Sequence, residues 1–317
     1  MSGTLIFDNR RRINYTALYF SEEDTNTGCQ NNNFKRRSYM RKKYSMIRIS
    51  FMFFLSIIIT GGLALAESEE VYTPEVGQAG KDVVWVPTPQ PLVDKMLDMA
   101  KVTPQDYLID LGSGDGRIVI TAAKRGVQAY GIEYNPDMVS LSKHNAAMEG
   151  VSDKAAFTEA DIFESDFSQA TVITMFLLPN LNMQLRPIIL GLKPGTRIVS
   201  NTFDMGEWMA DETATVSEGC ISYCTAYLWI VPANVEGTWK LPKKEELTIK
   251  QNFQMITGTL KSGNASMPVE GKIAGDRIRF NANGKTYVGR VNGDSMNGDF
   301  IGGRDGKWKA SRIRQEE

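Results

Sequence analysis

Residues 108–117 read Leu-Ile-Asp-Leu-Gly-Ser-Gly-Asp-Gly-Arg. The apolar residues at the start predict a buried strand, and the residues that follow the glycines have the apolar spacing of a helix. Five small or polar residues separate the two, namely Gly112, Ser113, Gly114, Asp115 and Gly116. A strand-to-helix turn of this kind lets a ligand contact the backbone N–H groups at the helix N-terminus. This stretch therefore predicts a ligand site within an α/β fold.

The sequence on both sides of this turn alternates between short apolar strands and helices. Strands are predicted over 107–111, 129–133, 155–158, 171–177, 196–203 and 225–232. Helices are predicted over 91–100, 117–125, 136–148 and 180–192. Strands that alternate with helices form parallel βαβ units, with helices on both faces of the sheet. The predicted fold class is therefore α/β, with a Rossmann-like sheet in a domain that spans residues 83–233.

The pattern changes after Pro232 to short alternating strands separated by Gly- and Asn-containing turns. This texture predicts a small all-β domain over residues 234–317, either a meander or a barrel. The stretches 237–241 (Gly-Thr-Trp-Lys-Leu) and 306–310 (Gly-Lys-Trp-Lys-Ala) resemble each other. They are either the paired edges that close a barrel, which would remove exposed edges, or a coincidence in Gly-rich sequence. Nothing in this domain indicates catalysis.

The N-terminal part of the chain has a different composition. Residues 1–45 are polar and without periodicity, which predicts disorder or sequence upstream of the true start codon. Residues 46–66 are mostly apolar, follow a basic stretch and end in Ala-Leu-Ala, which is the layout of a secretory signal peptide. An uncleaved membrane anchor is the alternative, and it would put the chain in contact with a membrane. Either places the rest of the chain outside the cytoplasm, after a linker over 67–82.

The composition excludes several classes of function. The chain has 317 residues and a formal net charge of −1, so its charge indicates no nucleic acid partner. Its single histidine, His144, argues against a multi-histidine metal site, and we predict no metal. Ser-His-Asp and Cys-His catalysis are excluded unless His144 itself takes part. The position of His144 on the helix 136–148 instead predicts a solvated surface residue.

The glycine spacing distinguishes between two classes of ligand. A dinucleotide site needs Gly-x-Gly-x-x-Gly, but the third glycine position is occupied here by Arg117, which argues against NAD. The stretch Asp-Leu-Gly-Ser-Gly-Asp-Gly-Arg instead resembles the first motif of class I S-adenosylmethionine (SAM)-dependent methyltransferases. This resemblance implies that SAM is the methyl donor and that the residues of the turn, Gly112 through Gly116, bind it. It also implies that Asp110 holds the amino-acid end of SAM, directly or through water.

Two further acids match the same family pattern. Glu133 ends the next strand, at the right distance for its carboxylate to accept from both ribose hydroxyls. Asp161 follows the third strand, where the family places an acid that meets the adenine amino group. Taken singly, Glu133 is compatible with a surface acid and Asp161 with a helix cap. Their order at successive strand ends favours the SAM site.

A closer resemblance covers about residues 81–212. The stretches Lys-Asp-Val-Val-Trp-Val-Pro-Thr-Pro, Gly-Ile-Glu-Tyr-Asn-Pro and Phe-Asp-Met-Gly-Glu-Trp resemble the mitochondrial lysine N-methyltransferases that modify the adenine nucleotide translocase and the c-ring protein of ATP synthase. This resemblance implies a seven-stranded sheet with one antiparallel edge strand. It also implies a protein lysine as the acceptor, in a substrate that includes membrane proteins as one option. The β domain departs from the mitochondrial members, and an exported site would lie where SAM is not plentiful.

Four residues are candidates for the acceptor side of the site. Trp85 and Thr88 lie in a stiff Val-Trp-Val-Pro-Thr-Pro segment that family position places over SAM. The alternative is that Trp85 packs on the sheet edge and Thr88 caps the following helix. Pro179 and Asn180 follow the strand 171–177, at the end of the sheet where such folds bind ligands. The alternative for Asn180 is the N-cap of the helix over 180–192.

Other residues near the predicted strand ends have a structural interpretation. Phe203, Asp204 and Trp208 follow the strand 196–203, and plain packing is favoured over a role in the acceptor channel. Cys220 and Cys224 are predicted to be free thiols, because two cysteines four residues apart on one strand are too distant for a disulfide.

The sequence thus predicts a SAM-dependent methyltransferase that acts on a protein lysine by in-line displacement of the methyl group. A small-molecule or lipid-linked acceptor is one alternative. The other is a non-catalytic envelope protein that keeps a methyltransferase scaffold. The combination of Asp110, the glycines, Glu133 and Asp161 argues against the non-catalytic alternative, whereas the export signal favours it.

Overall fold

The computed structural model of this protein describes residues 71–302 and 306–314. They belong to one compact unit, Glu70–Glu317. The predictions for residues 1–45 and 46–66 lie outside the described residues. Within the described residues, no helix is both long enough and apolar enough to cross a membrane.

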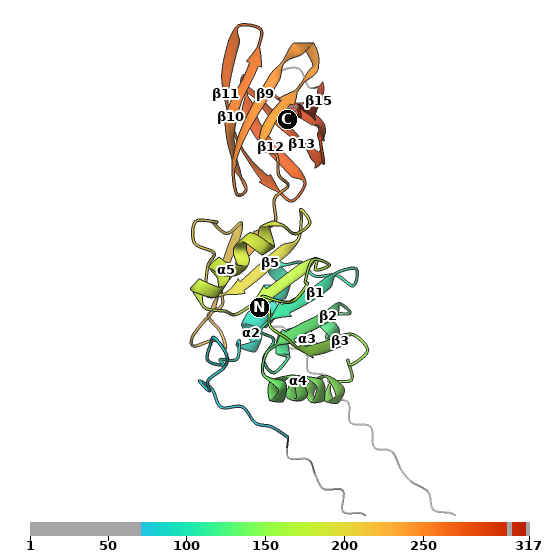
Figure 1. Ribbon diagram of the computed structural model, residues 1–317, viewed down its shortest axis with the longest axis vertical. Coiled ribbons are helices and arrows are strands. Elements are labelled where there is room, and N and C mark those ends of the chain that lie inside the picture. The colour runs from blue at the N-terminus through green and yellow to red at the C-terminus, as the bar shows by residue number, and fades with distance from the viewer. Residues whose placement is uncertain (1–70, 303–305, 315–317) are drawn as a thin grey trace, which may run out of the picture. The chain divides into compact units, whose positions relative to one another are not determined.

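A seven-stranded sheet forms the first part of the described chain (Figure 1). Its strands are β1 (Tyr107–Leu111), β2 (Gln128–Glu133), β3 (Ala155–Glu159), β4 (Val172–Met175), β5 (Arg197–Asn201), β6 (Glu212–Thr215) and β7 (Thr225–Ile230). Their order in the sheet is β3-β2-β1-β4-β5-β7-β6. Strands β1 to β5 are parallel, while β7 runs antiparallel to both of its neighbours. The antiparallel strand therefore lies one place in from the edge rather than at the edge, because β6 pairs with its outer side.

Helices cover both faces of this sheet, which confirms the predicted fold class. They are α2 (Gln90–Met99), α3 (Arg117–Lys124), α4 (Pro136–Met148) and α5 (Pro179–Leu190). Successive strand residues belong to opposite faces: Leu108 packs in the same core cluster as α2, α3 and α4, whereas Ile109 packs with α5. Burial on both faces explains why the strands read as unbroken apolar runs.

The helix starts are set by proline and by capping side chains. Pro136 is the first residue of α4, and the Asn135 side chain caps the helix by accepting from Asp137 N at 2.9 Å. Pro179 is likewise the first residue of α5. Asn180 therefore lies inside the first turn, and its interpretation as an N-cap is wrong. A proline has no N–H to satisfy and its φ already suits a helix, so the helix begins one residue earlier than the asparagine would allow.

The residues after the sheet form a closed eight-stranded barrel (Figure 1). Its strands are β8 (Gly237–Lys240), β9 (Glu246–Asn252), β10 (Met255–Ser262), β11 (Ala265–Ala274), β12 (Arg277–Ala282), β13 (Lys285–Asn292), β14 (Ser295–Ile301) and β15 (Gly306–Arg312). Closure comes from β15, which pairs with β8 through Ser311 and Lys240 and through Arg312 and Trp239. The two similar Gly-x-Trp-Lys stretches are thus the paired edges of a barrel. Buried aromatic side chains, including Trp239, Phe280 and Trp308, fill the interior.

Cys220 and Cys224 form a disulfide, so the prediction of free thiols is wrong. The prediction assumed an extended strand, but both residues lie in the connection between β6 and β7. This connection reverses direction and brings the two Cα atoms to 5.8 Å, within the range that a disulfide spans.

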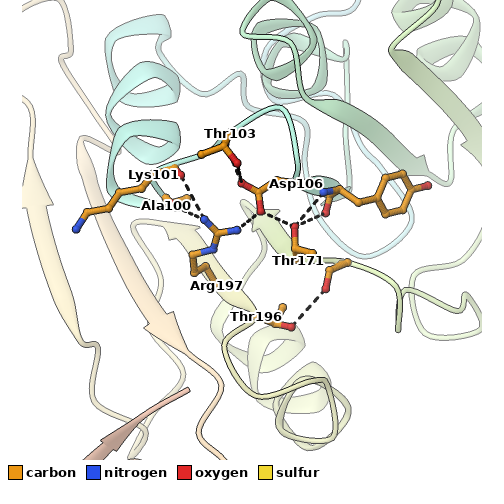
Figure 2. A network of polar contacts seen from close by, with 9 residues as sticks. Ala100, Lys101, Thr103, Asp106, Thr171, Thr196 and Arg197 are labelled. Carbon is orange, nitrogen blue, oxygen red and sulfur yellow. Dashed lines mark hydrogen bonds and ion pairs between the residues drawn. The ribbon is translucent and has the colours of Figure 1, made fainter. Parts of the chain in front are cut away.

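A polar network fixes the amino ends of the central strands, opposite the glycine turn (Figure 2). The Arg197 guanidinium pairs with Asp106 and donates to Ala100 O at 2.7 Å. Asp106 also accepts from the Thr171 hydroxyl at 2.8 Å and from Thr103 N at 2.8 Å. Burial acts to raise the pKa of Asp106, but these bonds and the arginine outweigh burial and lower the pKa. The network therefore stabilises the fold at neutral pH.

We expect Arg197→Met to lower the free energy of unfolding by about 2–4 kcal/mol, because it leaves the Asp106 carboxylate buried without its cation. The lowered pKa of Asp106 means that this stabilisation is present above the ordinary pKa of about 4 and is lost as the pH falls through the lowered value. Urea unfolding at pH 7 and pH 3 measures both effects. Lys193→Met removes an exposed cation from the neighbouring turn and serves as the control. Equal effects of the two substitutions would contradict the prediction.

Candidate active site

A cavity opens at the carboxyl ends of the parallel strands. The glycine turn, the residues that follow β2, β3, β4 and β5, and an N-terminal segment over 78–88 line it. Its location agrees with the rule that open α/β sheets bind ligands beyond the carboxyl ends of their strands. Six of the eight residues predicted to bind the cofactor come together here with Asp161, namely Asp110, Gly112, Ser113, Gly114, Asp115 and Glu133.

The glycine turn has backbone geometry that side chains rarely adopt. Gly112, Gly114 and Gly116 have φ values of +77°, +54° and +81°. The N–H groups of Gly112 and Ser113 both donate to Ile132 O, at 2.9 and 3.0 Å, which holds the turn against the end of β2. Gly112 and Gly114 line the cavity, and the buried Ser113 Oγ has no hydrogen-bond partner among the described residues. The turn thus presents small residues and a polar atom with spare bonding capacity at the cavity.

Gly116 is the predicted cofactor residue that does not line the cavity. A Cβ atom at this position would lie 2.7 Å from Ser142 Cβ and 2.8 Å from the Phe157 ring. Gly116 therefore permits close packing of the start of α3 against α4 and β3. This is the packing role that the third glycine has in a dinucleotide motif, performed one residue earlier in the chain.

We expect Gly116→Ala to lower the free energy of unfolding by about 2–4 kcal/mol, from overpacking added to left-handed backbone strain. Gly150→Ala is the matched control: Gly150 has φ +67°, but nothing lies within 4 Å of an added Cβ. It should lose only the strain, about 1 kcal/mol. Urea unfolding of both variants measures the difference, and equal losses would refute the packing role of Gly116.

Asp110 ends the buried part of β1 and is only 2% exposed. Its Oδ1 atom accepts from the Thr174 hydroxyl on β4 at 2.6 Å. Burial raises the pKa of Asp110 to about 7, the charges of Glu133 and Asp115 act in the same direction, and the Thr174 bond opposes them. A cation placed beside this carboxyl would favour its ionised form. Asp110 is therefore suited to the ammonium group of an amino acid.

Glu133 supports the glycine turn as well as facing the cavity. Its Oε2 atom accepts from Gly114 N at 2.9 Å, and its Oε1 atom accepts from Asn135 N at 3.0 Å. A carboxylate offers about four acceptor positions, so two remain after these bonds. Those two are enough for a pair of vicinal hydroxyls.

Asp161 has two contacts that are relevant to its assignment. It forms an ion pair with Lys81, which lowers the pKa of Asp161. Its Oδ1 atom accepts from Phe163 N at 2.8 Å, which is the capping contact of the alternative interpretation. Lys81 also lies over the ring of Tyr134, 4.6 Å from its centroid. Asp161 is thus at the cavity, but its carboxylate already has partners.

The N-terminal segment contributes more of the cavity lining than the sequence indicated. Residues 77–85 form a small hairpin in which Gly77 N donates to Trp85 O at 2.8 Å and Trp85 N donates to Gln78 O at 2.9 Å. Residues 78–82, predicted as part of a linker, line the cavity. Their Gly-rich, polar composition gave no signal for this role.

Trp85 and Thr88 both line the cavity. A Cβ atom on Gly114 would lie 2.8 Å from Trp85 Nε1, so the indole rests against the glycine turn. Thr88 is buried, and its hydroxyl accepts from Asn201 Nδ2 at 3.2 Å. The N-cap of α2 is Pro89, and no side chain caps this helix, so the capping alternative for Thr88 is wrong.

The opposite end of the cavity is apolar and aromatic. Phe176 follows β4, Phe203 follows β5 and Tyr223 precedes β7, and all three rings line the cavity. Leu178 and Leu181 complete this end. Pro179 and Asn180 are exposed in the first turn of α5 and do not line the cavity.

The remaining residues singled out in the sequence lie away from the cavity. Trp208 is fully buried and stacks on Phe253 at 5.9 Å, as the packing interpretation expected. Asp204 accepts from Gly206 N at 3.0 Å in a tight turn. His144 is exposed on α4.

These residues fit SAM. Asp110 would hold its ammonium group, Glu133 its ribose and Asp161 the adenine edge, with the glycine turn beneath. The Trp85 indole and the hairpin over 77–85 cover the turn and limit the access of water.

The sequence comparisons agree with this site. The model of the ANTKMT methyltransferase domain matches residues 110–212. A protein-lysine N-methyltransferase of Saccharolobus islandicus is 43% identical over 152 residues, which cover 47% of this chain and 94% of the relative. The lysine N-methyltransferase of Rattus norvegicus that is named for the c-ring protein of ATP synthase is 35% identical over 161 residues, which cover 49% of this chain and 74% of the relative.

Among solved structures, an RNA methyltransferase from Salinibacter ruber in complex with S-adenosyl-L-homocysteine is 47% identical. The similarity covers 47% of this chain and 96% of that chain, with a TM-score of 0.45.

Proposed function

This chain belongs to the family of SAM-dependent methyltransferases that includes the ANTKMT domain and the lysine N-methyltransferases just described, and we propose that its acceptor is the side-chain amine of a protein lysine. SAM is the methyl donor of this family. The observation that carries the proposal is the two-ended cavity, with carboxylates around the glycine turn at one end and three aromatic rings at the other.

SAM supplies a methyl group on a sulfonium, which is a good leaving group, so the chain mainly has to align the acceptor and exclude water. A lysine must lose its proton before its nitrogen can attack the methyl carbon. The described lining near Phe176, Phe203 and Tyr223 is apolar and has no carboxylate beside it. Desolvation there would lower the pKa of an entering lysine, so that the proton leaves to solvent without a dedicated base. This agrees with a chain that has one histidine, exposed on α4.

Methyl transfer to proteins tests the acceptor. The full chain is incubated with isotope-labelled SAM and membrane and soluble extracts, and labelled products are located by mass spectrometry. Label on the ε-amine of lysine in a protein supports the proposal. Label only on RNA or on small molecules would refute it and assign a different acceptor. SAM binding without transfer to any fraction would favour the non-catalytic alternative.

We also propose that residues 46–66 direct the chain out of the cytoplasm, either as a cleaved signal or as an anchor that contacts the membrane. The signal-like layout of this segment supports the proposal. The Cys220–Cys224 disulfide supports it as well, because disulfides persist mainly in oxidising compartments. SAM would then have to reach that compartment.

A fusion of residues 1–80 to a reporter that is active on only one side of the membrane tests this location. Activity outside and a mature mass that begins after Ala66 support a cleaved signal. An intact mass supports the anchor. Activity only in the cytoplasm would refute both.

A further inference from the structure

The connection between β6 and β7, residues 216–224, lies beyond the part of the chain that the family model matches. It is closed by the Cys220–Cys224 disulfide, and its base is tied by a bond from Val216 N to Cys224 O at 2.9 Å. On the next strand, Thr202 N donates to Thr225 O at 2.7 Å. These contacts hold the end of the connection against β5.

Tyr223 stands directly before the second cysteine and has φ +56°. A non-glycine residue in this region costs about 1–2 kcal/mol, and it persists where the surroundings fix the backbone. The short disulfide-closed loop provides that constraint. Its result is that the Tyr223 ring turns toward the cavity instead of continuing an extended strand.

The Tyr223 ring completes the aromatic end of the cavity. Its centroid lies 5.2 Å from that of Phe176 and 6.4 Å from that of Phe203, and those two rings are 6.1 Å apart. Tyr223 is 42% exposed, so it stands at the mouth while the two phenylalanines are more deeply placed. Ring faces attract an alkylammonium group and pack against its aliphatic stem.

We infer that Tyr223 is an acceptor-binding residue and that the Cys220–Cys224 disulfide positions it, an inference that rests on the proposed lysine methylation. The ring forms the outer wall of the channel through which the lysine stem enters. The disulfide takes no part in cofactor binding, because the residues that bind SAM lie on the glycine turn and at the ends of β2 and β3. Loss of the disulfide would therefore affect the acceptor and spare the cofactor.

Two probes of the full chain separate these contributions. One is S-adenosylhomocysteine (SAH), and the other is an SAH analogue in which a nitrogen bearing a butylammonium chain replaces the sulfur. The ratio of their affinities, measured by calorimetry, reports the contacts made by the lysine-like chain. We expect Tyr223→Ala and the double variant Cys220→Ser/Cys224→Ser each to reduce this ratio by about 3- to 30-fold. SAH affinity should stay within about twofold.

Tyr223→Phe should retain the ratio, because it keeps the ring. Ile221→Ala is the matched control from the same loop, since Ile221 is fully exposed and does not line the cavity. An unchanged ratio in both Tyr223→Ala and the cysteine variant would overturn the inference while leaving the proposed function intact. A native chain that binds the analogue no more tightly than SAH would also overturn it. A folded native chain that binds neither probe would refute the cofactor site itself, and with it the proposed function.

Discussion

Glu133→Ala should weaken SAM binding by about 100-fold or more. The carboxylate has two acceptor positions left for the ribose hydroxyls after its bonds to Gly114 N and Asn135 N. Each hydrogen bond to a charged group contributes about 1.5–3 kcal/mol, so the loss of two corresponds to at least about 3 kcal/mol. The two backbone N–H groups also lose their acceptor, which loosens the turn. Calorimetric titration of SAM into the native and variant chains measures the loss.

Glu159→Ala is the control for this substitution. Glu159 pairs in register with Glu133 on the neighbouring strand β3, but it is exposed and does not line the cavity. It removes the same charge from nearly the same place, so a general electrostatic effect would appear in both variants. If a folded Glu133→Ala variant binds SAM as the native chain does, the cofactor does not occupy the glycine turn.

Asp110→Asn should change binding and stability in opposite directions. In the chain without ligand, the pKa of Asp110 is raised by burial from an ordinary value of about 3.9 to about 7. A raised pKa means that Asp110 contributes stability that is fully present below about pH 4 and is lost as the pH rises through 7. Asparagine is uncharged, so the variant should be more stable than the native chain by roughly 2–4 kcal/mol at pH 8. The same variant should bind SAM much more weakly, because it has no charge for the ammonium group.

The pH dependence makes this prediction specific. The stability difference between variant and native chain should grow between about pH 4 and 7 and be constant above 7. The SAM affinity of the native chain should fall by up to about tenfold per pH unit below 7, while that of the variant should not depend on Asp110 ionisation. Urea unfolding and calorimetry at pH 5 to 8 measure both. Asp137→Asn, an exposed carboxylate in the first turn of α4, is the control. A variant that is less stable than the native chain at pH 8 would show that Asp110 is not held in its neutral form.

The buried strands and the glycine turn could be predicted from the sequence because their physical requirements are local. Strands such as Tyr107–Leu111 are apolar on both faces, and a turn that requires positive φ at three positions is written as three glycines. Strand β6 escaped prediction because Glu212–Thr215 is polar and largely exposed. Its existence depends on pairing with β7, which is a tertiary contact.

The acceptor end of the site was harder to predict for the same reason. Phe176, Phe203 and Tyr223 come from three separate connections, and only the fold brings their rings together. Pro179 and Asn180 were favoured by proximity in sequence to β4, but the helix that begins at Pro179 places them on the surface. The disulfide escaped prediction because the reversal of the chain around Ile221 has no strong turn signal. The lining role of residues 78–82 depends on Lys81 reaching Asp161, about eighty residues further along the chain.

The closure of the barrel between β8 and β15 has a consequence for the order of folding. Every other pair of neighbouring strands in the barrel is joined by a short connection, so those hairpins can form within microseconds of one another. The β8–β15 seam is the one pairing that must bring together segments from the two ends of the domain, and it carries the main entropic cost of closing a long loop. The seam rests on few strand pairs, supported by the Arg312 guanidinium over the Trp239 ring at 4.3 Å. The barrel should therefore zip from its hairpins, close last at this seam, and begin to unfold there first.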